Sequence, residues 1–283
     1  MTPGIWTAMY AELPLHEALR ALHACGWRAF EVSTEHLAAI ETDHDTEGQI
    51  ERAQRCLHDL GLCAPQAHAY LDADVAASNS DEREKDMSRL LCHTEIAARL
   101  GVHNVVMHPG GKHGYTTRAE QEHIHRLNIE AFRRLGDFAG AQAVRIGIEN
   151  LMCRGASTPS ELLELLEAID HPAIGITLDT SHANVAALDV AKVVRELGPH
   201  VVATHISDND GSGDQHLTPG SGTIDWPAVM DAFREIGYNG LFNLEIAGER
   251  HPVPAVRQLK LHLALEVAEW LVALADSQRG DTP

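Results

Sequence analysis

The feature that most constrains the fold is a regular alternation of short apolar segments with longer amphipathic ones. Apolar runs of strand length cover residues 4–10, 27–33, 62–68, 102–108, 144–149, 174–178, 201–206 and 240–246. Segments with helical spacing of apolar residues follow them at about 15–25, 47–60, 82–100, 118–135, 158–169, 184–197, 226–236 and 254–275. Strands that alternate with helices are typical of a parallel sheet covered by helices.

Local signals support these boundaries. A glycine follows several of the helical segments, where a left-handed residue ends a helix: Gly26, Gly61, Gly101 and Gly237. The segment that starts at Thr158 has Pro159 at the first helical position and Glu161 at capping-box spacing. Eight strand–helix units in 283 residues, without a composition shift that marks a linker, predict a closed (β/α)8 TIM barrel that forms a single domain over residues 1–283.

The charge balance bears on the partner. Lys and Arg number 22 against 41 for Asp and Glu, a net charge of −19. Affinity for nucleic acid depends largely on basic residues, so nucleic acid is an unlikely partner. The acidic segment 41–47 follows the second strand, and we expect it to be an acidic loop that would repel DNA.

Cysteine usage and the amino terminus indicate a compartment. Five cysteines are scattered without a C-x-x-C pair: Cys25, Cys56, Cys63, Cys92 and Cys153. This number and spacing predict neither a disulfide framework nor a structural zinc knuckle. The sequence starts without a signal-peptide pattern, and no apolar run approaches the roughly 18 residues that span a bilayer. We expect a cytoplasmic protein without a membrane partner, and the oligomeric state stays open, a homo-oligomer included.

Polar residues lie at or just past the ends of the predicted strands. They are Glu31, His68, His108, Glu149, Asp179, His205 and Glu245. The carboxyl ends of the strands form the face on which TIM barrels carry their chemistry. Carboxylates are almost never buried without a partner, and no Lys or Arg occupies a corresponding position. A divalent cation supplies the missing charge, and mixed His and carboxylate ligands suit Zn, Mn, Co or Fe.

Phosphate-binding motifs are absent from the strand-to-helix turns. Neither G-x-G-x-x-G nor G-x-x-x-x-G-K-[ST] occurs there, so the sequence predicts no dinucleotide or nucleoside triphosphate site. Lys112, Arg118 and Arg154 lie near strand-end loops without forming a recognisable phosphate cradle. These residues therefore do not favour a phosphorylated substrate.

Several segments carry a family resemblance. MHPGG, IGIEN, LDTSHA, HISDNDG, DQHLTPGSGTIDW and NLEI, which span strands three to eight, resemble the xylose isomerase-like barrel superfamily of sugar phosphate isomerases, epimerases and endonuclease IV. In the keto-sugar epimerases of this superfamily one metal ion is held by residues that match Glu149, Asp179, His205 and Glu245. The resemblance also implies that Glu149 and Glu245 move protons on opposite faces of the sugar.

The implied role is physically coherent. A metal that chelates a carbonyl and its neighbouring hydroxyl acidifies the C–H bond and stabilises an enediolate, so a nearby carboxylate can remove the proton. His182, His68, His108 and Trp6 are then expected to contact the sugar. The sequence thus favours a metal-dependent sugar isomerase or epimerase with one ion.

Two alternatives stay open. The trinuclear zinc cluster of endonuclease IV has a ligand pattern that nine positions here match: His68, His108, Glu149, Asp179, His182, His205, Asp214, His216 and Glu245. Up to three ions are then bound for phosphodiester hydrolysis. We expect instead that Asp214 and His216 shape a substrate loop, because an acidic protein suits a polyanionic substrate poorly. The other alternative is a non-catalytic metal-binding barrel, against which the dense polar set argues.

Overall fold

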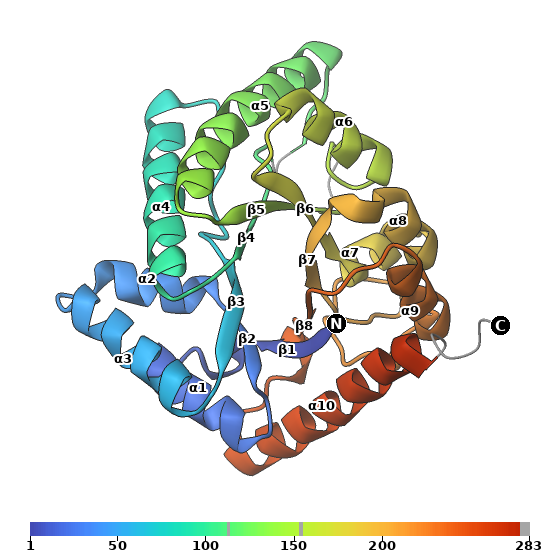
Figure 1. Ribbon diagram of the computed structural model, residues 1–283. Helices are drawn as coiled ribbons and strands as arrows, with labels where there is room; N and C mark the ends of the chain where they lie inside the picture. Colours follow the sequence, from blue (N-terminus) through green and yellow to red (C-terminus); the bar gives the residue numbers. More distant parts are fainter. Residues whose placement is uncertain (112–113, 153–154, 278–283) are drawn as a thin grey trace.

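The computed structural model describes residues 1–111, 114–152 and 155–277, and a ring of parallel strands forms its centre (Figure 1). The strands are β1 Thr2–Trp6, β2 Ala29–Val32, β3 Cys63–His68, β4 Asn104–Met107, β5 Arg145–Glu149, β6 Ile174–Asp179, β7 Val201–His205 and β8 Leu241–Leu244. They follow one another in chain order, and β1 pairs with β8. A parallel bridge between Ile206 and Leu244 joins β7 to β8. The predicted (β/α)8 barrel is confirmed.

Helices surround the strands on the outside (Figure 1). They are α1 Leu15–Ala24, α2 Thr34–Thr42, α3 Thr46–Asp59, α4 Ser80–Arg99, α5 Arg118–Ala141, α6 Pro159–Ile169, α7 Thr180–Val185, α8 Val190–Leu197, α9 Trp226–Glu235 and α10 Pro254–Ser277, with 3-10 turns η1 Thr7–Tyr10, η2 Gly198–His200 and η3 Ala247–Glu249. Apolar faces of these helices and the outward side chains of the strands form the core, with Phe30, Phe132 and Phe242 fully buried. Among the described helices, none has the length and apolarity needed to cross a membrane.

Some predicted boundaries were wrong. The strand expected at 4–10 ends at Trp6, since residues 7–10 turn into η1. The helix expected to end at residue 135 continues to Ala141, because Gly136 serves packing: a Cβ there would lie 2.5 Å from Nδ1 of His171. The helix expected at 184–197 is two helices, separated where Ala187 adopts a positive φ of 57°.

The acidic segment 41–47 was also misinterpreted. Its start belongs to α2, a helix that the sequence did not reveal, and its side chains are paired. Glu41 lies 2.9 Å from Arg89, and Glu47 pairs with Arg99. Asp45 caps α3 by accepting a hydrogen bond from the amide of Gly48. These carboxylates stabilise contacts between helices. Beyond their contribution to the net charge, they therefore do not argue against DNA binding.

Four of the cysteines, Cys25, Cys56, Cys63 and Cys92, are free thiols. Cys153, Lys112 and Arg154 lie outside the residues that the structure describes.

Glycines let side chains fill the barrel interior. Alternate residues of a strand point to the same side, so Gly175 shares the inner side of β6 with Asp179. A Cβ at Gly175 would lie 2.4 Å from Cγ1 of Val202 and 3.0 Å from the carbonyl oxygen of His200. Glycine at this position therefore makes room for Val202 below the polar face.

We predict that Gly175→Ala lowers the free energy of unfolding by about 1–3 kcal/mol, the usual cost of overpacking a filled interior. Urea denaturation measures the change. Gly213→Ala is the matched control, because a Cβ at Gly213 meets no atom within 4 Å. Combining Gly175→Ala with Val202→Ala should cost less than the sum of the two single changes. Equal stability of the Gly175→Ala and Gly213→Ala variants would contradict the interpretation.

Candidate metal centre

The carboxyl ends of four neighbouring strands bring one set of ligand atoms together. Glu149, Asp179 and His205 end β5, β6 and β7, and Glu245 follows β8. One ligand atom of each residue lies within 4.8 Å of those of the other three. The first three side chains are buried, and Glu245 is 13% exposed. The quartet expected from the sequence is therefore assembled.

Negative charge dominates this quartet. Nδ1 of His205 lies 2.8 Å from Oε1 of Glu149 and 3.1 Å from Oε2 of Glu245. Burial lowers the pKa of His205, but the charges of Glu149 and Glu245 outweigh it and raise the pKa well above its ordinary value. Burial raises the pKa of Asp179 and Glu245. Three carboxylates around one imidazole leave an excess of negative charge that calls for a cation.

The surroundings of the buried carboxylate oxygens show whether a cation fits the quartet. Oδ2 of Asp179 is buried and has no hydrogen-bond partner. Oε2 of Glu149 is also buried and faces only imidazole nitrogens, at 3.0 and 3.4 Å, without a well-formed hydrogen bond. A buried polar atom without a partner costs about 1–3 kcal/mol, and more when it carries charge. Carboxylate oxygens and an imidazole nitrogen form the donor set that Zn and related ions accept. The residues present fit a divalent metal.

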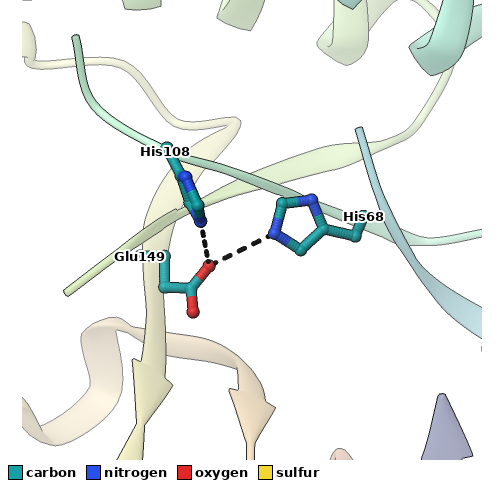
Figure 2. Close-up of side chains that lie close together, drawn as sticks. All are labelled: His68, His108 and Glu149. Carbon is teal, nitrogen blue, oxygen red and sulfur yellow. Dashed lines mark ion pairs between the residues drawn. The ribbon is translucent and has the colours of Figure 1, made fainter. Parts of the chain in front are cut away.

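A second set flanks the quartet and shares Glu149 (Figure 2). Nε2 of His108 lies 3.0 Å from Oε2 of Glu149, and Nε2 of His68 lies 3.4 Å from the same oxygen. Nδ1 of His68 lies 2.8 Å from the carbonyl oxygen of Ala69, which can only accept. When His68 is neutral, its Nε2 therefore carries a lone pair that faces the Glu149 carboxylate. Because both groups are acceptors, a proton or a metal must lie between them.

A third set repeats this arrangement and shares Asp179. It contains His182 and His216, and Asp214 lies between them. Oδ2 of Asp214 is 2.9 Å from Nε2 of His216 and 3.4 Å from Nε2 of His182. Nδ1 of His182 lies 2.8 Å from the carbonyl oxygen of Asn150, and Nδ1 of His216 lies 2.9 Å from that of Glu245. Both imidazoles thus direct Nε2 towards a carboxylate, as metal-binding histidines do.

The loop that carries Asp214 and His216 is held under strain. His216 has a positive φ of 47°, which is uncommon for a residue with a side chain. Burial lowers the pKa of His216, but Asp214 and the nearby carboxylates raise it to about 10. Asp208 fixes the loop, because its carboxylate accepts from the Gly220 amide at 2.8 Å and from Nε1 of Trp226 at 2.9 Å.

The sequence did not assign a role to Glu31, which the structure places beneath the quartet. Oε2 of Glu31 lies 2.9 Å from Nε2 of His205 and also accepts from the amide of Gln66. Glu31 and Gln66 are buried. Glu31 thus fixes the His205 ring with Nδ1 turned to Glu149 and Glu245. The sequence signal that could have revealed Glu31 is a carboxylate within the apolar strand AFEV.

A pocket of about 420 Å³ opens above these sets. Its wall includes Trp6, Glu35 and Leu71, together with His68, His108, Glu149, His182, Asp214, His216 and Glu245. The guanidinium carbon of Arg250 lies 4.6 Å over the Trp6 ring. The described residues of the wall contain no Lys or Arg. A larger cavity of about 640 Å³ contains none of the predicted ligands, so the smaller pocket is the candidate site.

Comparison with known proteins gives independent evidence of the family. The profile described as xylose isomerase-like TIM barrel matches residues 19–271. The chain belongs to the xylose isomerase-like TIM-barrel family. The resemblance found in the sequence is confirmed.

Relatives within the xylose isomerase-like family are distant. An uncharacterised protein of Methanocaldococcus jannaschii is 29% identical over 69% of this chain and 68% of its own length. A D-psicose 3-epimerase of Ruminiclostridium cellulolyticum is 22% identical over 74% of this chain and 72% of its length. The structure of a D-tagatose 3-epimerase-like protein superimposes with a TM-score of 0.78 at 25% identity, covering 96% of this chain and 98% of that one. This chain also matches an uncharacterised protein of Sinorhizobium fredii and covers 64% of the length of that protein.

We predict that Glu31 positions His205 for metal binding. Glu31→Leu removes both the charge and the acceptor, and should weaken metal binding by roughly ten- to a hundredfold, the scale of other outer-shell changes. Glu31→Gln can keep an acceptor oxygen and should lose less. Competition titration with a chromogenic chelator measures the affinity. Glu35→Gln changes a pocket carboxylate that no described contact joins to His205, and should bind metal as the parent does. Parental affinity in Glu31→Leu would refute the role.

Proposed function

We propose that this protein is a divalent-metal-dependent isomerase or epimerase of a sugar. The observation that carries the proposal is the pair Glu149 and Glu245, which approach His205 Nδ1 to 2.8 and 3.1 Å at the base of a pocket of about 420 Å³. Two carboxylates beside one another can exchange protons with a carbon atom held between them. A pocket of this volume suits a small molecule.

The proposed chemistry is proton transfer next to a carbonyl. One carboxylate takes the proton from the carbon beside the substrate carbonyl, and the electrons of the C–H bond pass to the carbonyl oxygen. In an epimerisation the other carboxyl group returns a proton to the opposite face of the same carbon. In an isomerisation a proton is returned to the neighbouring carbon, and the hydroxyl proton of the first carbon passes to the former carbonyl oxygen. A divalent ion bound by Glu149, Asp179, His205 and Glu245 supplies the positive charge that stabilises the oxygen in its anionic form.

Other residues of the pocket are proposed to bind the sugar. Trp6 is 8% exposed and lies in the wall, where its ring offers an apolar surface to the C–H face of a sugar. His108 and His182 lie at the same wall and can bond hydroxyl groups. The names of relatives point the same way, since they include D-psicose 3-epimerases and inosose isomerases.

The flanking sets favour a second candidate, a multinuclear phosphodiesterase. His68, His182 and His216 each turn Nδ1 to a backbone carbonyl and Nε2 to a carboxylate, which supports ligation more than substrate contact. Against it stand the net charge of −19 and a described wall without Lys or Arg. We therefore propose one principal ion in the quartet, with the flanking sets as accessory sites.

Loss of either proton carrier should abolish turnover. Glu149→Gln and Glu245→Gln should each reduce the rate by roughly two or more orders of magnitude, since positioned acid–base groups contribute on that scale. In D2O the parent should incorporate deuterium at the carbon that changes, detected by mass spectrometry in a screen of ketoses. Turnover without label would exclude this carboxylate route. Metal binding without turnover on any sugar would favour the non-catalytic alternative.

Metal stoichiometry separates the two candidates. A variant with Asp214→Ala and His216→Ala removes two side chains of the third set and leaves the quartet intact. Under the epimerase proposal it keeps the principal ion, and the Michaelis constant for the sugar changes more than kcat. Elemental analysis per chain checks the count, with Asp210→Ala on the same loop as control. Loss of one ion from three, together with loss of phosphodiester cleavage, would favour the second candidate.

A further inference from the structure

Asn150 follows β5 and contacts Asp179, the last residue of the neighbouring strand β6 (Figure 1). Oδ1 of Asn150 accepts a hydrogen bond from the Asp179 amide at 2.7 Å, and Nδ2 donates to the carbonyl oxygen of Asp179 at 2.9 Å. Asn150 is 2% exposed, so water does not compete for these bonds. The side chain therefore pairs with the backbone of Asp179 as another strand would.

This pairing replaces one bond of the ladder between β5 and β6. The amide of Asn150 donates to the carbonyl oxygen of Thr177 at 3.3 Å, as the register of the two strands requires. In a parallel ladder the next bond would run from the Asp179 amide to the carbonyl oxygen of Asn150. Because the side chain takes the Asp179 amide, that carbonyl oxygen is left for Nδ1 of His182, which lies 2.8 Å away.

The Asn150 carbonyl oxygen keeps the His182 ring out of the quartet. Nδ1 of His182 lies farther from two quartet oxygens, at 3.7 Å from Oε1 of Glu149 and 3.8 Å from Oδ2 of Asp179. A carbonyl oxygen can only accept, so Nδ1 carries the proton of this bond. Without the carbonyl oxygen as acceptor, that proton would turn to carboxylate oxygens that a metal ion needs.

Asp179 completes a closed set of contacts with His182. Its Oδ1 accepts from the His182 amide at 2.7 Å at the start of α7, and its Oδ2 is buried without a hydrogen-bond partner. One carboxylate oxygen thus caps a helix, and the other can bind an ion. Since Asn150 holds the backbone of Asp179, the helix cap and the Asn150 side chain together set the direction of Oδ2.

We propose that Asn150 is a positioning residue of the metal centre. Its side chain holds the backbone of Asp179 and, by replacing a ladder bond, releases the carbonyl oxygen that orients the ring of His182. The consequence for metal binding rests on the proposed function, whereas the orientation of the ring does not.

NMR of the histidine ring protons in the metal-free protein tests the orientation of His182. In the parent, the Nδ1 proton of His182 should exchange slowly with water and give a resolved signal, assigned by its loss in His182→Gln. In Asn150→Ala the Asp179 amide should turn to the carbonyl oxygen of residue 150, as in a regular ladder, so the signal should shift or disappear. If Asn150→Ala does not fold, Asn150→Leu keeps the branched shape without polar atoms and serves in its place.

Zinc affinity tests the consequence for the quartet. Asn150→Ala should bind zinc roughly ten- to a hundredfold more weakly than the parent, the scale of other outer-shell changes. The physical reason is that the His182 proton then occupies carboxylate oxygens of the quartet. Competition with a chromogenic chelator measures the affinity.

Asn128→Ala is the matched control. Asn128 is 4% exposed, and its side chain pairs with the backbone of Gly110 in the same way, accepting from the amide at 2.7 Å and donating to the carbonyl oxygen at 3.1 Å. This variant should lower the midpoint of urea denaturation as Asn150→Ala does, and should keep the His182 signal and the zinc affinity of the parent.

Two results would overturn the proposal: a parental His182 signal in folded Asn150→Ala, or an equal loss of zinc affinity in the Asn150 and Asn128 variants. A parent that binds no zinc would contradict the proposed function, and the NMR comparison would still decide the role of Asn150. Neither measurement uses a sugar, so a failure of the proposed sugar chemistry is seen separately, in the screen of ketoses.

Discussion

The site depends on one constraint, the burial of several carboxylates at one end of the barrel. Glu149, Asp179 and Glu31 are buried, and Glu245 is nearly so. Buried charge is costly unless it is paired, and the described ion pairs to the carboxylates of the quartet come from histidine. An imidazole neutralises a carboxylate only when protonated, which explains why the pKa of His205 rises despite burial. Protons and divalent cations therefore compete for the same places.

The quartet could be predicted from the sequence because a local pattern marks each of its residues. Each ligand ends a short apolar strand, and in a parallel barrel all such ends meet at one face. The supporting role of Glu31 could not be predicted in this way. Its partner His205 lies 174 positions away in the sequence, and a carboxylate at a strand end can equally bind a metal or hold a metal ligand in place. The ring orientations of His68 and His182 could not be predicted either. They are set by the carbonyl oxygens of Ala69 and Asn150, whose directions depend on the folded backbone.

Helix boundaries failed for a similar reason. Gly136 has the sequence signature of a helix end, but the structure uses it to admit the ring of His171. Segment 41–47 has the composition of a solvated loop, yet Glu41 meets Arg89 from α4. In both places a contact distant in sequence overrides the local preference. Errors of this kind moved element ends without changing the barrel, because the order of strands and helices is set by the alternation itself.

Sharing of ligands links the number of ions to the chemistry. Glu149 belongs to the quartet and to the His68 set, and Asp179 belongs to the quartet and to the His182 set. A cation in the quartet neutralises the charge that attracts a second one, so the flanking sets should bind more weakly once the quartet is filled. With only the quartet filled, His68 and His182 remain at the pocket wall. Under the proposed function, the difference in affinity between the quartet and the flanking sets therefore decides whether His68 and His182 hold a further ion or only line the sugar pocket.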